Sequence, residues 1–594
     1  MCGIAGFVSR NHAGDRRGQL ARMHGAIAHR GPDDRGAWQS AHYDADFVHT
    51  RLSIIDPSPA GHQPMPLGDR FTITYNGEIY NFAELRNALA ASGVTFRSNS
   101  DTEVILRLYE AHGPACVDRL RGMFAFAIWD EQERSCFVAR DRFGIKPLYY
   151  HDEAGVFTFA SEVRALLAGG VPAEVDANAA YHYFRSGSVP EPLTLIRGVR
   201  ALEAGHYLLW HDGRLTSRKY WDLCFPEAAP AENAAAMARA ALLDSVTHHF
   251  VSDVPVGVFL SGGMDSTAIV ALASAVRGRG LRTFSLTFPG SDLDEGPEAR
   301  RIAEHFATDH HEWALDGATA AGLFEHFLAA ADQPSIDGFN TFIVARLARR
   351  HDTKVVLSGL GGDAMFGGYP SFREVPRLAR LGQLVRLGGP LSTAAVRVAG
   401  ELGGSRLRRL NDLMSSPADL ANAYGVFRGI YSSEEATALT SHYLGEHVAS
   451  AEDMSSTFSD PTPEDSISRL ELTRYMRNQL LRDADVMSMA SGVELRVPFV
   501  DSGVFDALSR LPAHQRLERG KALLHRAVPE IPDWIARRPK RGFTLPLEQW
   551  LSRDFARTVT QIDGPPAIAI DSWYRKWSLL AFERWLQRLS PQHV

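Results

Sequence analysis

The sequence predicts a protein that mixes α and β structure in two unlike parts, an α+β part followed by an α/β part. Short runs in which apolar and polar residues alternate, such as FTITYNGEIYNF and MFAFAIWD, fill the first 220 residues and indicate antiparallel strands. Further along, apolar runs at 256–260, 281–288 and 353–360 alternate with helical patterns, which is typical of a buried parallel sheet. From about residue 370 onward the pattern is mainly helical.

Local signals place the individual elements. In the first part, NFAELRNALAASG and TEVILRLYEAHG have the pattern of helices, while Asn76-Gly77 and Asp212-Gly213 are strong turn signals. In the second part, a helix is expected in AAMARAALLDSVTHHF, before the first buried strand, and another in STAIVALASAVRG, after it. The residues of 225–236 are rich in Pro, Ala and Glu and lack apolar periodicity. We therefore expect a first domain at 1–220, a linker at 221–236 and a second domain at 237–594.

Composition excludes several classes of protein. The chain has 594 residues, 45% of them hydrophobic and 22% charged, so disorder, collagen and a coiled coil do not describe it. Lysine and arginine number 63 against 70 acidic residues, a net charge of −7, which argues against a broad basic field for nucleic acid.

The number of cysteines and the length of the apolar runs indicate in which cellular compartment the protein works. The four cysteines, Cys2, Cys116, Cys136 and Cys224, are too few for a disulfide framework and match no zinc spacing. The N-terminus has no apolar core of a secretory signal, and no run approaches the ~18 apolar residues of a membrane span. We expect a cytoplasmic protein with no membrane and no nucleic-acid partner.

The first candidate site is Cys2, which follows the initiator methionine directly. Removal of that methionine would leave a thiol beside a free α-amine. The ordinary pKa of an α-amine is about 7.7–8.0, so it can serve as the general base of the nucleophile. Taken alone, Cys2 would more simply be an incidental residue.

Five further residues complete a site for free glutamine: Arg51 in HTRLSIID, Asn76, Gly77 and Glu78 in YNGEIYN, and Asp101 in SNSDTEV. A guanidinium binds a carboxylate, and carboxylates bind an ammonium group. A side-chain amide and a backbone N–H can together stabilise an oxyanion. These are the requirements for binding glutamine and cleaving its side-chain amide.

The segments MCGIAGF, HRGPDD, RLSIID, YNGEIYN and SDTE occur in an order that resembles the glutaminase domain of class II, N-terminal-nucleophile glutamine amidotransferases. The resemblance implies an αββα sandwich for the first domain. It implies Cys2 as nucleophile and Asn76 with Gly77 as oxyanion hole. It also implies glutamine binding by Arg51, Asn76, Glu78 and Asp101, and it makes 141–149 scaffold or a wall between two sites.

The second candidate site begins at Ser261-Gly262-Gly263-Met264-Asp265-Ser266, between a predicted strand and a helix. Such a loop presents backbone N–H groups at a helix N-terminus and binds anions. It lacks the Walker pattern and resembles the pyrophosphate loop of enzymes that split ATP into AMP and pyrophosphate. A second loop starts at Ser358 and reaches Asp363, so Asp265 and Asp363 are candidate ligands of Mg²⁺.

The predicted ATP site also has a place for adenine, at the ends of two neighbouring strands. Its expected residues are Leu260, Ser261, Gly262, Gly263, Asp265, Ser266, Leu286, Ser358 and Gly359. Lys540, in RPKRGF, is the candidate for stabilising charge on the α-phosphate and the leaving pyrophosphate.

Together the two parts are similar to glutamine-hydrolysing asparagine synthetases over nearly the whole chain. The resemblance implies that ATP adenylates a carboxylate, that Cys2 releases ammonia from glutamine, and that ammonia crosses an internal tunnel to form the amide. It also implies a homodimer.

Two departures from that family concern the acceptor. The second loop, which typically reads SGEGxDE, has Leu360 and Ala364 where the family has glutamates. The segment that holds aspartate, typically close to TTIRAST, reads DQPSIDGFNT and offers no arginine, although Asp337 and Asn340 could meet an amine, an amide or a hydroxyl. The resemblance makes aspartate the default acceptor. The two departures favour a specialised-metabolite or sugar-acid carboxylate as the alternative. An intramolecular cyclase, a pure glutaminase and a catalytically inactive scaffold are the other interpretations.

Overall fold

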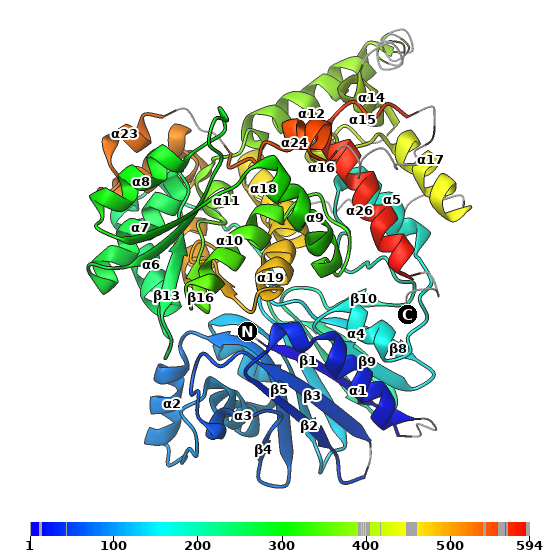
Figure 1. Cartoon of the computed structure of the whole chain (residues 1–594), viewed down its shortest axis with the longest axis vertical. Helices are drawn as coiled ribbons and strands as arrows, with labels where there is room; N and C mark the ends of the chain where they lie inside the picture. Colours follow the sequence, from blue (N-terminus) through cyan, green and yellow to red (C-terminus); the bar gives the residue numbers. More distant parts are fainter. Residues whose placement is uncertain are drawn as a thin grey trace.

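The computed structural model describes residues 2–10, 15–42, 44–389, 404–415, 417–446, 460–538, 542–555 and 568–589, together with 392, 394, 396, 398 and 565. An antiparallel sandwich forms one end of the molecule, and a parallel sheet with its helices forms the other (Figure 1).

The sandwich consists of two six-stranded antiparallel sheets within the described chain. The first has the order β10-β8-β9-β1-β3-β2: β1 Gly3–Val8, β2 Asp34–Gln39, β3 Ala45–Arg51, β8 Tyr149–Glu153, β9 Val156–Ala160 and β10 Arg200–Ala201. The second has the order β12-β11-β7-β6-β5-β4: β4 Met65–Leu67, β5 Phe71–Ile79, β6 Gly122–Asp130, β7 Ser135–Arg140, β11 His206–His211 and β12 Arg214–Lys219. Their inner faces share one core that includes Ile4 and Phe47 from the first sheet and Ala127 and Val138 from the second.

Helices cover both outer faces of the sandwich. Phe7 and Val48 of the first sheet pack with α1 (Arg16–Ala26), α4 (Val163–Ala168) and α5 (Ala177–Ser186). The second sheet packs against α2 (Phe82–Ala91) and α3 (Asp101–His112). The short helices η1 (Ala28–Arg30), η2 (Pro59–Gly61) and η3 (Gly113–Arg119) lie in the connections. This arrangement is an αββα sandwich, so the predicted fold class is confirmed.

One of the two turn signals was wrong. Asp212-Gly213 does connect β11 to β12. Asn76-Gly77, in contrast, lies inside β5, where Asn76 is opposite Ala125 and Gly77 is opposite Phe124 of β6. Pairing along the whole of β5 outweighs the local preference of the dipeptide for a turn. Gly77 is needed there because a Cβ atom would lie 2.2 Å from the carbonyl oxygen of Met123.

The second part is built on a five-stranded parallel sheet of order β15-β14-β13-β16-β17 in the described residues. Its strands are β13 Val256–Phe259, β14 Arg282–Thr287, β15 Asp309–Ala314, β16 Val355–Leu357 and β17 Glu494–Arg496. The helices around it are α6 Ala234–His249, α7 Met264–Arg277, α8 Gly296–His305, α9 Gly317–Ala330, α10 Phe339–Arg350, α11 Gly362–Phe366 and α19 Arg482–Met489. Because β13 and β16 are neighbours, the loops that follow them meet at the same edge of the sheet.

The remaining elements are helical, as the sequence predicted. They are α12 Ser371–Leu387, α14 Ser405–Leu410, α15 Asp412–Ser415, α16 Leu420–Arg428, α17 Ser433–Leu444, α18 Pro463–Leu470, the π-helix η4 Glu471–Leu481, α20 Ser502–Ser509, α21 Ala513–Arg516, η5 Arg519–Lys521, α22 Ala522–Ala527, α23 Asp533–Ala536, α24 Leu547–Arg553 and α26 Trp573–Leu589. The last helix returns to the sandwich, where Phe582 stacks on Tyr183 of α5 at a centroid distance of 5.7 Å. No helix in the described chain is long and apolar enough to cross a membrane.

A fully buried arginine joins the sandwich to the second part. Arg30 donates to Glu162 at 2.8 Å and to Asp485 of α19 at 2.7 Å, and its Nε donates to the carbonyl of Cys2 at 3.0 Å. Its removal takes one cation from two buried carboxylates, which leaves Arg164 beside Glu162 and Lys146 beside Asp485.

We expect Arg30→Met to lower the free energy of unfolding by about 3–5 kcal/mol, because breaking a buried ion pair costs more than the pair itself contributes. Chemical denaturation followed by circular dichroism measures the change. Arg218→Met, on the exposed strand β12, is the control and should shift the midpoint little. Equal stability of Arg30→Met and the wild type would contradict the interdomain role.

Candidate functional site

The start of β1 places Cys2 in the interior, at 8% exposure. The Cys2 nitrogen donates to Oδ1 of Asn76 at 3.0 Å, and the Cys2 carbonyl is held by Arg30. Burial raises the pKa of the Cys2 thiol above its ordinary value. The thiol therefore needs a base close by, which fits the use of an α-amine on the same residue.

A small pocket of about 20 Å³ opens beside Cys2. Four of the residues predicted for glutamine line it: Arg51, Gly77, Glu78 and Asp101. These four residues come from three separate sequence motifs, and the fold brings them together around one pocket. Asn76 lies directly behind, fully buried, and its Nδ2 has no hydrogen-bond acceptor in the described chain. A buried amide donor without a partner is what an oxyanion hole requires.

Two of the pocket's charged groups are held by the protein itself. Arg51 donates from Nη2 to the carbonyl oxygens of Ile55 and Asp56, at 3.2 and 2.6 Å. Asp101 accepts from the hydroxyl of Tyr75 at 2.8 Å and from the amide of Ile79 at 3.0 Å. These bonds fix both groups before any ligand arrives, which reduces the entropy lost on binding.

Glu78 is coupled to two residues that the sequence patterns did not indicate. It lies 3.4 Å from Nη2 of Arg496 in β17, and Nε of Arg496 donates to Glu494 at 2.5 Å. Burial and the nearby charge of Glu494 raise the pKa of Glu78 well above its ordinary value. The only signal in the sequence is the pair of opposite charges inside the apolar run VELRVPFV. The second part of the chain therefore contacts a residue of the Cys2 pocket from outside that pocket.

We expect Asn76→Asp to lower kcat for glutamine hydrolysis about 10²–10³-fold, because the variant keeps the shape but loses the Nδ2 donor. A coupled glutamate assay measures this. The matched control is Asn87→Asp on the exposed face of α2, which should retain full activity. Unchanged hydrolysis by Asn76→Asp would remove Asn76 from the oxyanion hole.

Hydrogen bonds from a side-chain hydroxyl to the backbone hold the loop between β13 and α7 in its conformation. Ser266 Oγ donates to the carbonyls of Ser261 and Gly263, at 3.0 and 3.1 Å. The second loop approaches so closely that a Cβ on Gly359 would lie 2.8 Å from the amide nitrogen of Ser266. Leu260 and Leu286 are buried at the ends of adjacent strands, near this loop. The residues predicted for ATP thus lie along one edge of the sheet.

Two carboxylates from these loops meet at a lysine. Lys521 lies 2.6 Å from Asp265 and also contacts Asp363. Its side chain is 7% exposed; burial opposes the charged form, but the two carboxylates raise the pKa of Lys521 above its ordinary value. The sequence patterns did not single out this residue, although Gly520-Lys521 before a short helix was visible. Lys540, the residue predicted for a similar role, lies outside the described residues.

The chemistry of this cluster suits magnesium bound to phosphate. Mg²⁺ in nucleotide sites is held by one or two carboxylates plus phosphate oxygens, not by a cage of protein ligands. Asp265 and Asp363 supply two such carboxylates at one point, and the described residues contain no cluster of three or more metal-binding side chains. The basic segment near the C-terminus also reaches the loop, where Arg538 donates to the carbonyl of Gly262 at 3.3 Å.

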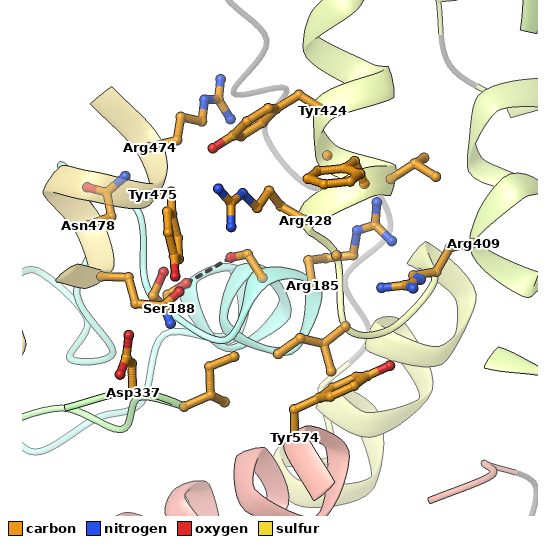
Figure 2. Close-up of a pocket in the computed structure, with 18 of the residues that line it drawn as sticks. Arg185, Ser188, Asp337, Arg409, Tyr424, Arg428, Arg474, Tyr475, Asn478 and Tyr574 are labelled. Carbon is orange, nitrogen blue, oxygen red and sulfur yellow. Dashed lines mark hydrogen bonds between the residues drawn. The ribbon is translucent and has the colours of Figure 1, made fainter. Parts of the chain in front are cut away.

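The residues that depart from the family pattern lie on two sides of this site. Ala364 is fully buried in α11, and Leu360 packs at the edge of the core. Asp337 and Asn340 line a cavity of about 1470 Å³, shown in Figure 2. Burial raises the pKa of Asp337. The residues of the Ser261–Ser266 loop do not line this cavity in the described structure. The predicted acceptor pocket is therefore separate from the predicted nucleotide loop.

Comparison with known proteins agrees with this two-site arrangement. Residues 1–221 match the family described as Glutamine amidotransferase domain, and residues 237–587 match Asparagine synthase. Fold and sites together define a glutamine amidotransferase joined to an amide-forming domain. The chain belongs to the family of glutamine-hydrolysing asparagine synthetases.

Two relatives illustrate what this chain is similar to. Asparagine synthetase [glutamine-hydrolyzing] 1 of Bacillus subtilis is 34% identical, over 95% of this chain and 90% of its own. Amidase chry2 of Gibberella zeae is 27% identical, over 95% and 91% respectively. Among solved structures, the allosteric regulatory enzyme of purine biosynthesis overlaps 52% of this chain and 80% of its own at 15% identity, with a TM-score of 0.30, a likeness too weak to carry an argument.

Proposed function

We propose that the chain is an ATP-dependent amide ligase that takes ammonia from glutamine. Residues 1–220 form the glutaminase domain, 221–236 the linker and 237–594 the synthetase domain. One observation supports the proposal: the chain contains both halves of such a reaction. Asp265 and Asp363 contact Lys521 beside a glycine-rich loop, and the nitrogen of Cys2 donates to the side chain of Asn76.

In the glutaminase domain, the thiol of Cys2 attacks the side-chain amide of glutamine and transfers its proton to the α-amine. Nδ2 of Asn76 and the N–H of Gly77 stabilise the oxyanion that forms. Arg51 binds the α-carboxylate of glutamine, while Glu78 and Asp101 bind its ammonium group. The α-ammonium group returns the proton to the amide nitrogen, ammonia leaves, and a thioester remains on Cys2. Water then hydrolyses the thioester and releases glutamate.

In the synthetase domain, the acceptor carboxylate attacks the α-phosphorus of ATP, and pyrophosphate leaves. The loop Ser261–Ser266 binds the phosphates through its N–H groups, together with Ser358 and Gly359, and Leu260 and Leu286 contact the adenine. Lys521 stabilises the charge that develops on the α-phosphate and the leaving pyrophosphate, and Lys540 assists it. Asp265 and Asp363 would hold Mg²⁺, and the ion would supply positive charge to the pyrophosphate.

Ammonia then attacks the acyl-adenylate, and the products are an amide and AMP. A direct internal path is favoured because ammonia released into water at neutral pH is mostly protonated and not nucleophilic. Arg30 and Arg496 link the Cys2 site to the second part of the chain, and we place the path along this contact. The proposal also carries over the homodimer and the cytoplasmic location expected from the sequence.

Aspartate is the default acceptor, and the alternative is a different carboxylate, because Leu360 and Ala364 replace acidic residues. Leucine can neither accept a proton nor bind an ammonium group. The deciding experiment is product analysis with amide-¹⁵N glutamine, ATP, Mg²⁺ and aspartate. Labelled asparagine with stoichiometric AMP establishes aspartate as acceptor. Glutamine hydrolysis without asparagine directs the search to other carboxylates, and hydrolysis that no acceptor or ATP affects identifies a pure glutaminase.

A further inference from the structure

The large cavity beside the synthetase site exceeds what a free amino acid needs. Its volume is about 1470 Å³, whereas sites for drug-sized ligands measure about 300–1,000 Å³. It lies between α5 of the sandwich, α16, η4, the segment around Phe543 and the start of α26. The residues of the ATP loop do not contribute to its described lining. The cavity is therefore space additional to the nucleotide site.

Side-chain amides are the first chemical feature of this cavity. Gln479, Asn478, Asn340 and Asn422 all line it. Gln479 is only 6% exposed, yet its amide makes no hydrogen bond within the described chain. Both polar atoms of the Asn478 amide already bond to the backbone, of Glu191 and Thr473, and Asn422 donates to the carbonyl of Pro417. The carboxamide of Gln479 offers both a donor and an acceptor, which are the groups that a peptide bond presents.

The helix that carries Gln479 is itself unusual. η4 is a π-helix that runs from Glu471 to Leu481, whereas π-helical structure is rare and concentrated at functional sites. It directs Arg474, Tyr475, Asn478 and Gln479 toward the same cavity. Figure 2 shows three of these side chains along one wall.

Charge is distributed unevenly around the cavity. Arg185 and Arg409 lie on the side opposite Asp337 (Figure 2). Arg185 is oriented by an ion pair with Asp412, and Arg428 by an ion pair with Glu471 at 2.6 Å and by stacking over Tyr475. Fixed guanidinium groups bind carboxylates with directional hydrogen bonds. This side of the cavity suits an anionic group on the ligand.

The cavity is connected to the synthetase site through one wall. Tyr475 contacts Tyr369 edge to face at a centroid distance of 5.7 Å. Tyr369 follows Gly368, whose amide donates to the carbonyl of Asp363 at 2.9 Å. A ligand in the cavity thus lies next to the segment that carries Asp363.

We propose that this cavity binds the body of a peptide-like acceptor, a short acidic peptide whose terminal aspartate is amidated at the adjacent site. The amide of Gln479 pairs with one of its peptide bonds, and the arginine side receives a second carboxylate. This inference rests on the proposed amide-ligase function and names its substrate class.

Gly425 allows the cavity to be filled without disturbing the fold. It lies on α16 and lines the cavity, and no atom lies within 4 Å of a Cβ placed on it. Gly425→Trp therefore puts an indole into the cavity. Gly322→Trp, on the exposed side of α9, is the matched control because its Cβ also meets nothing within 4 Å. Gln479→Leu is a second variant that keeps the size of the side chain and removes its amide.

The experiment measures acceptor-dependent pyrophosphate release with aspartate and with N-acetylated peptides of increasing length that end in aspartate. We expect kcat/KM to rise at least about tenfold from aspartate to the longest peptide, because contacts remote from the reacting carboxylate contribute binding energy. Gly425→Trp should lower the value for that peptide at least about tenfold, and Gln479→Leu should lower it in the same direction. Neither should change glutamine hydrolysis without acceptor, and Gly322→Trp should change nothing.

Aspartate as the best substrate, together with no effect of Gly425→Trp on any acceptor, overturns the peptide site and leaves the amide ligase intact. If no acceptor releases pyrophosphate, the proposed function fails, and calorimetric titration of the longest peptide decides the cavity separately. Binding to the wild type that is lost in Gly425→Trp supports the cavity assignment. Absence of binding to the wild type overturns it.

Discussion

We expect replacement of Cys2 by alanine to abolish glutamine-dependent amide formation, while ammonium salts should still support it. The thiol is the nucleophile of the proposed glutaminase reaction, and no other cysteine in the described chain lines its pocket. Loss of a catalytic nucleophile typically costs about 10⁴-fold or more in kcat, so hydrolysis should fall to the background rate. The synthetase loops contain no cysteine, so ammonia supplied from solution should bypass the defect.

The measurement compares glutamate release and amide formation in the same preparation, with glutamine or with ammonium chloride as nitrogen source. Cys224→Ala is the control, because Cys224 is an exposed free cysteine far from the pocket in sequence. Its activities should match those of the wild type. Glutamine-driven synthesis at the wild-type rate in Cys2→Ala would end the nucleophile assignment.

The fold was predictable wherever structure depends on local periodicity. The alternating runs FTITYNGEI and MFAFAIWD became β5 and β6, and the buried runs near 256–260 and 281–288 became β13 and β14. β17 was missed because three residues, Glu494–Arg496, are too few to show a period. The turn expected at Asn76-Gly77 was wrong because pairing with β6 extends through it, a tertiary effect that a dipeptide cannot indicate.

The candidate sites were predictable to the extent that they lie in contiguous motifs. Cys2, Arg51, Glu78 and Asp101 were found because each has a recognisable neighbourhood, and the structure places them around one pocket. Lys521 had no such neighbourhood: it lies 256 positions from Asp265, and only folding brings the two together. The sequence favoured Lys540 instead, since a run of basic residues is visible locally.

The coupling of Glu78 to Arg496 and Glu494 was beyond prediction for the same reason. The sequence does show two opposite charges in one short strand, and Glu494 and Arg496 indeed form an ion pair. What the sequence could not show is that a residue of the glutaminase pocket joins the same cluster. The strand also touches the synthetase site, because the amide of Ser358 donates to the carbonyl of Arg496 at 2.9 Å. One three-residue strand therefore contacts both candidate sites.

Neutralising either carboxylate beside Lys521 should stop pyrophosphate release while leaving basal glutamine hydrolysis unchanged. We expect Asp265→Asn and Asp363→Asn each to lower acceptor-dependent pyrophosphate release at least about 10²–10³-fold, since each loses charge where the pyrophosphate and its cation must be held. Asparagine keeps the shape of the side chain, so its contact with the lysine survives as a hydrogen bond. The Cys2 pocket contains neither residue, and its hydrolysis therefore serves as an internal check on folding.

Asp222→Asn is the control for charge alone. Asp222 forms an exposed ion pair with Lys219, and such pairs contribute little to stability. Its pyrophosphate release should equal that of the wild type. Normal release in both Asp265→Asn and Asp363→Asn would refute the assignment of this cluster to ATP. Loss of pyrophosphate release together with loss of glutamine hydrolysis would instead point to a structural role, because the two reactions share no residue of the cluster. Selective loss of the ATP reaction is the result that distinguishes an amide ligase from a pure glutaminase with a vestigial second domain.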